Sequence, residues 1–151
     1  ADLFKWQQDG LVEWLGKRDD VAKLLRDADL AVLPSWREGL PKALLEAAAA
    51  GLVMVATDVP GCREIVRPNE NGLLVPLRDE NALADAIEEL MEDDAKRAKF
   101  GKAARDLVER DYGDRVIIPK TLPAVTADEP RCPLQTVPFP NHWGHRLSAS
   151  H

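Results

Sequence analysis

The chain has 151 residues, of which 45% are hydrophobic and 30% are charged, and its formal net charge is −6. This length and composition are typical of one globular domain with a substantial core, and they exclude a mainly disordered chain. The acidic balance argues against a nucleic-acid partner, because a phosphate backbone is bound by clustered cations.

Cysteine content and hydropathy indicate a cytosolic chain. Cys62 and Cys132 are the two cysteines, too few for a disulfide framework, so a reducing compartment fits. The longest apolar run, residues 47–57, contains Gly51 and falls well short of a membrane span. No signal peptide is visible. We therefore expect a cytoplasmic protein, with peripheral association to the inner face of the plasma membrane left open.

The first half of the chain alternates predicted strands and helices. An apolar run at residues 11–16 predicts a strand, and Asp19 and Asp20 then open a helix, since a helix N-terminus favours acidic side chains. A second strand is predicted at residues 30–35. The next helix spans residues 41–51: its proline fits the first turn and its glycine fits the C-terminal stop.

The same alternation continues after this helix. Residues 52–57 and 72–76 predict two more strands, Asp79 is the expected N-cap of a third helix, and helical spacing marks a fourth over residues 100–108. Near-continuous apolar strands are typical of a parallel sheet covered on both faces. We therefore predict an α/β fold over residues 1–112, a Rossmann-like parallel sheet with flanking helices.

The composition changes at residue 113. Residues 113–151 hold six of the 11 prolines and all three histidines, without a lasting helical or strand period. We expect a Pro-rich, poorly ordered tail rather than a second domain. Cys132, His142 and His145 in this tail match no standard zinc spacing, so we expect no metal site there.

The stretch REGLPKALLEAAAAG, residues 37–51, places one glutamate on each side of a helix start. The free N–H groups of a first helical turn attract anions such as phosphate, and Gly39 permits close backbone approach. The carboxylates of Glu38 and Glu46 suit sugar hydroxyls instead. Together they suggest a nucleoside diphosphate sugar, bound beyond the carboxyl end of the preceding strand.

A structural interpretation of the same residues stays open. Glu38 near a helix N-terminus would add about 0.3–1 kcal/mol of stability without any ligand. Glu46 has the spacing to pair with Lys42 at i, i+4 on a solvated face. Nearby, Trp36 is expected to be a packing residue, with ligand stacking as the alternative, and Cys62 a buried or partly exposed thiol rather than a nucleophile.

The motif and its setting, PSWREGLPKALLEAAAAG, closely resemble the C-terminal half of retaining GT-B glycosyltransferases of group 1, family 4, whose E-x7-E motif matches Glu38 and Glu46. The resemblance runs from about residue 10 to residue 112. It implies an incomplete GT-B C-terminal domain, a partial nucleotide-sugar-binding domain over residues 1–112. It also implies a role in polysaccharide biosynthesis.

The resemblance assigns roles to individual residues. Glu46 matches the glutamate that binds the ribose hydroxyls, and Glu38 matches the catalytic position set against the donor sugar. Lys42 matches a position near the ribose or phosphates, although its side chain could equally face solvent. The loop beside the sugar and diphosphate matches Gly39, Leu40 and Pro41, and the loop beside the nucleobase matches Gly16, Lys17, Arg18 and Asp19.

The implied reaction is the transfer of a hexose from a nucleotide-diphosphate sugar, with UDP as the expected nucleotide, to a glycan or lipid-linked acceptor. The anomeric configuration is kept, and no metal or other cofactor is expected. Asp27 and Asp29 spell the D-x-D metal motif of another glycosyltransferase class, but they span a predicted helix end and strand start, so we interpret them as structural.

The chain also departs from the family pattern. The basic pair that clamps the diphosphate in the family is not matched here, and neither is the N-terminal acceptor domain. We therefore expect the isolated chain to be a fragment that is inactive alone and needs that domain as its partner. The alternative is a non-catalytic nucleotide-sugar-binding module, or a decayed fragment without a ligand.

Overall fold

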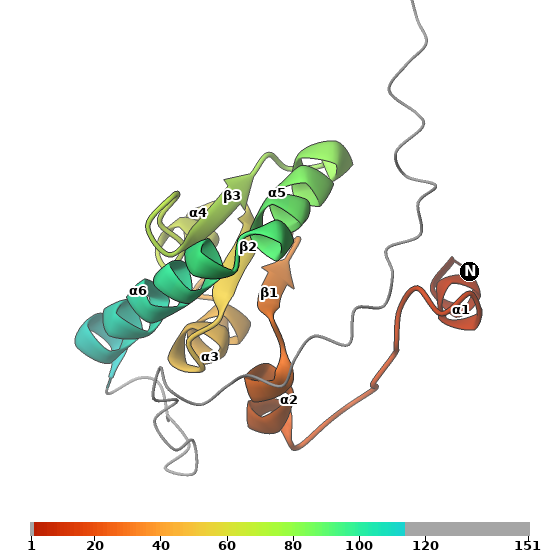
Figure 1. Ribbon diagram of the computed structural model, residues 1–151, viewed down its shortest axis with the longest axis horizontal. Coiled ribbons are helices and arrows are strands. Elements are labelled where there is room, and N and C mark those ends of the chain that lie inside the picture. Colours follow the sequence, from red (N-terminus) through yellow and green to blue (C-terminus); the bar gives the residue numbers. More distant parts are fainter. Residues whose placement is uncertain (1, 114–151) are drawn as a thin grey trace, which may run out of the picture.

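The computed structural model describes residues 2–113, which form a three-stranded sheet with helices on both faces (Figure 1). The predicted α/β architecture with a Rossmann-like parallel sheet is confirmed. The predicted tail lies outside the described residues, apart from its first residue, Gly113. In chain order the elements are α1 (Asp2–Gln8), α2 (Val21–Asp27), β1 (Leu30–Leu33), α3 (Lys42–Ala49), β2 (Val53–Thr57), α4 (Pro60–Arg63), β3 (Gly72–Val75), α5 (Glu80–Glu92) and α6 (Asp94–Tyr112).

The sheet has the order β1-β2-β3, and both pairs of strands are parallel. Val32 of β1 pairs in register with Val55 of β2, which in turn pairs with Leu73 of β3. Every residue of the central strand is buried, as its near-continuous run of apolar side chains predicts. Because the strands are parallel, the loops that follow all three meet at one edge, called here the carboxyl edge.

The strand predicted at residues 11–16 is wrong. This stretch forms no strand and is exposed throughout, including Leu11, Trp14 and Leu15. An apolar run becomes a strand only when a neighbouring strand accepts its backbone hydrogen bonds, and within residues 2–113 none does. Figure 1 shows this stretch as an extended connection between α1 and α2. The helix α1 was not expected from the sequence.

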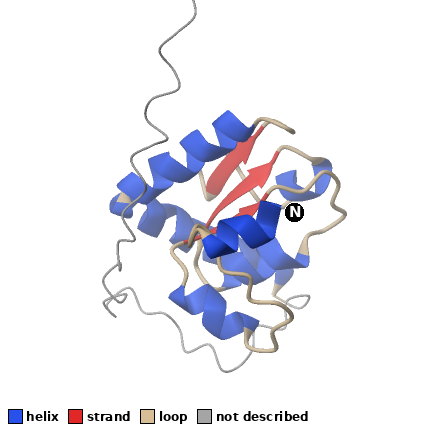
Figure 2. Cartoon of the chain, turned by 90° about the vertical axis from the view of Figure 1, so that its right-hand side faces the viewer, coloured by secondary structure: helices blue, strands red, loops and turns tan. Residues whose placement is uncertain are grey.

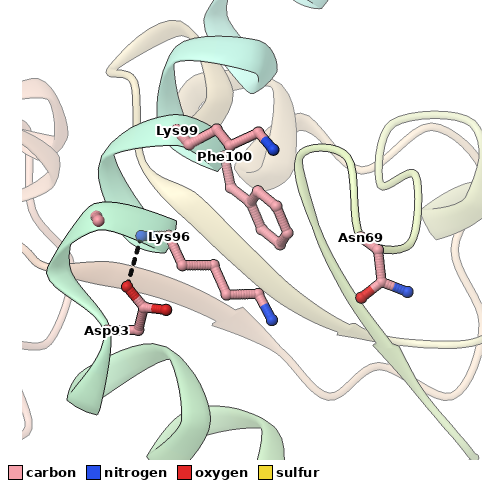
Figure 3. Close-up of a pocket in the computed structure, with 6 residues that line it drawn as sticks. Asn69, Asp93, Lys96, Lys99 and Phe100 are labelled. Carbon is pink, nitrogen blue, oxygen red and sulfur yellow. Dashed lines mark hydrogen bonds between the residues drawn. The ribbon is translucent and has the colours of Figure 1, made fainter.

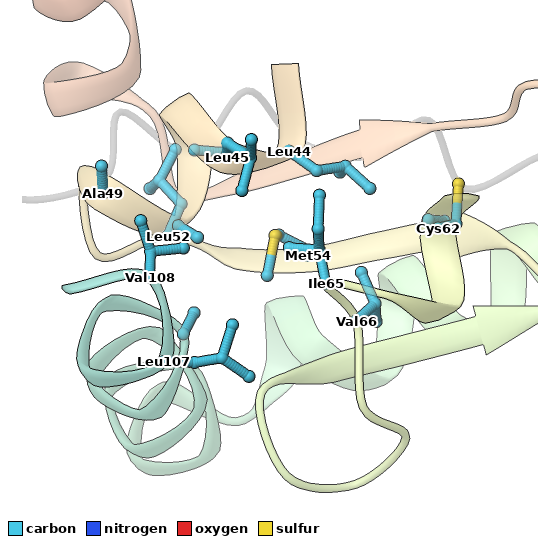
Figure 4. Packing of buried hydrophobic residues seen from close by; sticks show 14 of the residues in the cluster. Leu44, Leu45, Ala49, Leu52, Met54, Cys62, Ile65, Val66, Leu107 and Val108 are labelled. Atoms are coloured by element: carbon cyan, nitrogen blue, oxygen red, sulfur yellow. The ribbon is translucent and has the colours of Figure 1, made fainter. Parts of the chain in front are cut away.

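The core lies on both faces of the sheet, because side chains of a strand alternate between faces. Met54 and Ala56 of β2 belong to a cluster with α3, α4 and the second half of α6 (Figure 4). Val53 and Val55 face the other way and pack with α5 and with Phe100 of α6. Figure 2 shows the strands between these helical layers.

The helix boundaries follow local signals in the sequence. The Asp79 carboxylate accepts a hydrogen bond of 2.9 Å from the N–H of Ala82 at the start of α5, so the predicted N-cap is confirmed. Gly51 has a φ of 74° after the end of α3, which is the left-handed conformation expected of a helix stop. Pro41 immediately precedes α3 as its N-cap, one residue outside the helix rather than within its first turn.

Candidate functional site

The two motif glutamates lie on either side of the start of α3. Glu38 is half-buried in the loop that leads from β1 to α3, and Glu46 is the fifth residue of α3 with 34% of its side chain exposed. Because this loop follows a strand of a parallel sheet, it lies at the carboxyl edge, where ligands bind in open α/β folds. The structure therefore places both glutamates where the sequence predicts them.

The loop between β1 and α3 is attached to the next strand. The Thr57 hydroxyl, at the end of β2, donates a hydrogen bond to the backbone carbonyl of Ser35. Thr57 is buried, so its hydroxyl group finds its hydrogen-bond partner within the protein rather than in water. The contact fixes the start of the loop above the centre of the sheet, and Glu38 follows three residues later.

The loop also packs tightly against α4. A Cβ placed on Gly61 would lie 1.9 Å from the carbonyl oxygen of Gly39 and 2.5 Å from that of Glu38. These atoms belong to the backbone, so no side-chain rotation relieves such a contact. Only glycine fits at position 61, because the loop that carries Glu38 packs directly against it. This loop is distant from Gly61 in the sequence, so sequence patterns do not reveal the contact.

The thiol next to Gly61 is structural. Cys62 is fully buried, and burial raises the pKa of its thiol, with smaller contributions from the negative charges of Glu38 and Asp58. A raised pKa disfavours the thiolate, the nucleophilic form. The prediction that Cys62 is not a nucleophile agrees with this environment, which also places Glu38 near the start of α4.

An ion pair lies directly after β2 at the carboxyl edge. The Arg63 Nε atom is 2.5 Å from the Asp58 Oδ1 atom, and both side chains are about half exposed. The hydrogen bond from Arg63 lowers the pKa of the Asp58 carboxyl group. The pair joins the end of β2 to the last residue of α4, and thereby supports the helix against which the Glu38 loop packs.

The N-terminus of α3 has an unusual cap. Pro41 is the N-cap and makes no side-chain hydrogen bond to the helix, although its carbonyl accepts from the N–H groups of Leu44 and Leu45 at 3.1 and 3.3 Å. The usual Ser, Thr, Asp or Asn cap is therefore missing. The first-turn N–H groups of Lys42 and Ala43 are not capped by a side chain of Pro41, which suits an incoming anion.

Lys42 and Glu46 form the i, i+4 pair that the structural interpretation expects. The Lys42 Nζ atom is 3.3 Å from the Glu46 Oε1 atom, and the Lys42 side chain is 86% exposed. The pair occupies one carboxylate oxygen of Glu46 in the unliganded protein. A role for either residue toward a nucleotide remains a prediction.

The loop predicted to lie beside a nucleobase is exposed. Residues 16–19 have no buried side chain, Gly16 has a φ of 62°, and Arg18 pairs with Asp20 at 2.6 Å. Within residues 2–113, no hydrogen bond or ion pair joins residues 16–19 to residues 38–46. Within the described residues, the structure therefore shows no polar contact between the two predicted parts of the site.

A tryptophan and an arginine meet at the same edge. Trp36, two residues before Glu38, is 65% exposed, so its expected packing role is wrong. The Arg78 guanidinium lies over its ring, 4.4 Å from the ring centroid. Arg78 belongs to the turn between β3 and α5, and no signal in the sequence connects it to Trp36 or to the motif.

A shallow hollow of about 430 Å³ lies away from these residues (Figure 3). Asn69, Lys96 and Phe100 help to line it, and Asp93 caps α6 beside it through a 2.8 Å hydrogen bond from the N–H of Lys96. Asn69 precedes β3, so the hollow lies at the amino end of that strand, opposite the carboxyl edge. Its position therefore separates it from the motif glutamates.

Neither a metal-binding cluster nor a membrane-spanning helix is present in the described part of the chain. Residues 2–113 contain no group of three His, Cys, Asp or Glu side chains arranged to hold a metal ion. Asp27 ends α2 and Asp29 directly precedes β1, as the structural interpretation of this pair expects. Cys132, His142 and His145 lie outside the described residues. Among the described helices, none is both long and apolar enough to cross a bilayer.

The family profile described as "Glycosyl transferases group 1" matches residues 2–93, a stretch that includes β1, α3, β2 and the E-x7-E motif. The chain belongs to the group 1 glycosyltransferases. This confirms the resemblance drawn from the motif and its setting at the level of the family.

Similarity to individual proteins agrees with the family match. An N-acetylgalactosaminyltransferase of Campylobacter jejuni, named for the acceptor N,N'-diacetylbacillosaminyl-diphospho-undecaprenol, is 38% identical over 114 residues, or 75% of this chain and 30% of that protein. The sucrose-phosphate synthase of Thermosynechococcus elongatus is 34% identical with a TM-score of 0.67, covering 72% of this chain and 28% of that structure. Anabaena HepE, solved in complex with UDP, is 28% identical with a TM-score of 0.67, covering 72% and 31%.

These structures place the chain within a larger architecture. The fold resembles the C-terminal half of GT-B glycosyltransferases, as the sequence predicts. The chain spans less than a third of each of these three proteins. The match therefore corresponds to one part of the length of these relatives, which include an enzyme of glycan biosynthesis.

Proposed function

We propose that this chain is the donor-binding part of a retaining glycosyltransferase that uses a nucleotide-diphosphate sugar. The observation that carries the proposal is the placement of Glu38 and Glu46 on either side of the α3 N-terminus, at the carboxyl edge of a parallel sheet. A group 1 family match covers this whole arrangement.

In this proposal, each group binds a different part of the ligand. The N–H groups at the start of α3 attract the diphosphate, because the helix N-terminus carries partial positive charge. Glu46, one and a half turns further along, accepts hydrogen bonds from the ribose hydroxyls. Glu38 faces the donor sugar and stabilises positive charge that develops at the anomeric carbon when the diphosphate leaves.

The proposed ligands follow from the relatives. UDP is the proposed nucleotide, supported by the UDP complex of Anabaena HepE. A glycan or lipid-linked acceptor is proposed because the Campylobacter jejuni relative is named for a diphospho-undecaprenol acceptor. Such an acceptor would place the reaction at the inner face of the plasma membrane. No metal is proposed for the leaving group, since helix N–H groups supply the positive field.

Catalysis itself is proposed to need a second domain that provides the acceptor site. The chain spans less than a third of the length of these relatives, and the residues proposed to bind the donor all lie at one edge of a single sheet. We propose that the isolated chain binds the nucleotide and is inactive in transfer until the N-terminal domain is supplied.

An NMR titration of the full 151-residue chain with UDP tests the proposal. We expect saturable shifts at residues 38–46, lost or weakened at least about tenfold by Glu46→Ala, since a carboxylate that binds two hydroxyls contributes on the order of 1.5–3 kcal/mol. The matched control is Glu88→Ala, which removes an exposed glutamate from α5. No shift at millimolar UDP, or equal binding by wild type and Glu46→Ala, contradicts the proposal.

A further inference from the structure

We propose that Arg78, held over Trp36, is a phosphate-binding residue of this site, in addition to the N-terminus of α3. The ligand class is a phosphate or diphosphate group, from the donor nucleotide or from a lipid-diphosphate acceptor. The inference rests on the proposed function for the identity of the molecule that carries the phosphate. Its structural basis is the contact between the loops that follow β1 and β3.

The position of Arg78 is the first observation. Arg78 lies in the turn after β3, and Trp36 lies in the loop after β1, so their contact spans the carboxyl edge above the central strand. Trp36 is separated from Glu38 by one residue. The guanidinium is therefore at the edge where the ligand is proposed to bind, in contact with the loop that carries Glu38.

The backbone of Arg78 is the second observation. Its φ is 64°, in the left-handed region that residues with a Cβ adopt at a cost in conformational energy. A glycine or asparagine would adopt this conformation more readily. The chain nevertheless holds an arginine in this conformation, with its side chain over the Trp36 ring.

The free charge of Arg78 is the third observation. Within residues 2–113, no carboxylate lies within ion-pair distance of Arg78, although most arginines in this part of the chain have such a partner. The adjacent Asp79 is occupied, since its carboxylate caps α5 through the N–H of Ala82. The Arg78 N–H groups are therefore available to an external anion.

The chemistry of the pair favours phosphate over other ligands. A guanidinium that stacks on an aromatic ring keeps its N–H groups at the edge of its plane, where they donate to two oxygens of a phosphate at once. The Trp36 face fixes the plane and reduces the rotamer freedom that binding would otherwise remove. The pair thus forms a pre-organised cation at the carboxyl edge.

The test compares four probes on the full chain by NMR titration: UDP, uridine, inorganic pyrophosphate and farnesyl diphosphate. The main variant is Arg78→Asn, because asparagine tolerates the positive φ while the charge is removed. Arg78→Lys keeps the charge without the planar fork, and Trp36→Ala removes the ring. Arg26→Gln is the control, since Arg26 is an exposed arginine in α2 without an ion pair among the described residues.

We expect Arg78→Asn to weaken pyrophosphate and UDP binding about tenfold, with smaller losses in the other two site variants and none in Arg26→Gln. Uridine carries no phosphate group, so its affinity is expected to stay unchanged in Arg78→Asn. An Arg78 effect on UDP identifies the donor as the source of the phosphate, whereas an effect confined to farnesyl diphosphate identifies a lipid-linked acceptor.

Two results overturn the inference: equal affinities of wild type and Arg78→Asn for all three phosphate probes, or no binding of any of them. Different results would contradict the proposed function: wild-type protein that binds neither UDP nor uridine, or equal UDP affinities of wild type and Glu46→Ala. Pyrophosphate binding that depends on Arg78 would survive that failure. The two proposals are therefore separated by the same set of titrations.

Discussion

Gly61 of α4 lies so close to Gly39 that a Cβ on Gly61 would be 1.9 Å from the Gly39 carbonyl oxygen. The loop that carries Glu38 is thus seated directly on the start of α4, with no space for a methyl group between them. Since both partners in the contact are backbone, the position of Glu38 is coupled to the position of α4. This packing contact therefore helps to set the position of a residue that is proposed to bind the donor.

We predict that Gly61→Ala displaces the Glu38 loop. The alanine methyl group must push the carbonyls of Glu38 and Gly39 away, at a cost of roughly 1–3 kcal/mol in the free energy of unfolding, as for other overpacked sites. Amide shifts over residues 36–42 and a weaker response to UDP are the expected signs. Chemical denaturation and an NMR titration measure the two effects.

Two other glycines serve as matched controls. A Cβ on Gly39 would meet no atom within 4 Å, so Gly39→Ala is expected to leave stability unchanged and to weaken UDP binding only through its contact with the ligand. A Cβ on Gly101 would lie 2.1 Å from the Gly51 carbonyl oxygen, so Gly101→Ala is expected to lower stability through α6 packing. If Gly61→Ala leaves residues 36–42 unshifted, the proposed coupling is wrong.

Thr57 provides a second link between the sheet and the site. Its buried hydroxyl donates to the carbonyl of Ser35, and Thr57→Val removes this hydrogen bond while it keeps the branched shape. We predict a loss of about 1–2 kcal/mol in the free energy of unfolding, because the part-buried carbonyl of Ser35 loses its partner. Faster amide exchange over residues 35–40 should accompany it, as the loop is no longer tied to β2.

The control for this effect is Thr57→Ser, which keeps the hydroxyl and deletes one methyl group. The serine variant should retain slow exchange in residues 35–40 even though it loses some packing stability. Equal exchange rates in the valine variant and the wild type would show that the hydrogen bond does not restrain the loop.

The sequence predicts the central architecture because its signals are local. β1, β2 and β3 coincide with apolar runs of the sequence. Asp79 marks a helix start and Gly51 a helix end through interactions that involve only neighbouring residues. Glu38 and Glu46 are also placed correctly, since their positions depend on one helix start. These features need no knowledge of distant contacts.

The wrong or missing predictions concern contacts between distant segments. Residues 11–16 have an apolar pattern that fits a strand, but a strand also needs a neighbouring strand to pair with. The sequence pattern of one segment cannot show whether such a neighbouring strand is present. Trp36 was expected to pack, yet its ring meets Arg78, 42 positions along the chain. The tight seat of Gly39 on Gly61 likewise depends on how two loops approach each other.

The Lys42–Glu46 pair leads to a third prediction. Its two charged atoms are 3.3 Å apart, and the lysine side chain is 86% exposed, so solvent screens the attraction. A double-mutant cycle with Lys42→Ala and Glu46→Ala is expected to give a coupling free energy of about 0.3–0.5 kcal/mol, measured by urea denaturation. High salt should reduce it further.

The same variants separate structural from ligand-binding roles. If Glu46 serves the ribose, Glu46→Ala weakens uridine binding far more than its small effect on stability explains, while Lys42→Ala leaves uridine binding within about twofold of wild type. A coupling free energy above roughly 1.5 kcal/mol would instead show that the pair is a substantial structural contact, contrary to its exposure.

The buried thiol of Cys62 predicts how stability changes in alkaline solution. Burial raises its pKa in the folded protein above the ordinary value of 9.0, with Glu38 and Asp58 adding to the shift. As the pH rises past about 9, the unfolded chain loses the thiol proton first and therefore binds fewer protons than the folded chain. The free energy of unfolding must then fall with pH, and this loss is absent at neutral pH.

Thermal unfolding of the wild type and Cys62→Ala between pH 7 and pH 10.5 checks this expectation. The alanine variant is less stable at neutral pH, because it leaves a small cavity, but its stability should decline less steeply above pH 9. Lysine and tyrosine ionisation affect both proteins equally, so the difference between the two curves isolates the thiol. Parallel curves over the whole range would show that Cys62 ionises as readily in the folded chain as in the unfolded one, which is incompatible with its complete burial.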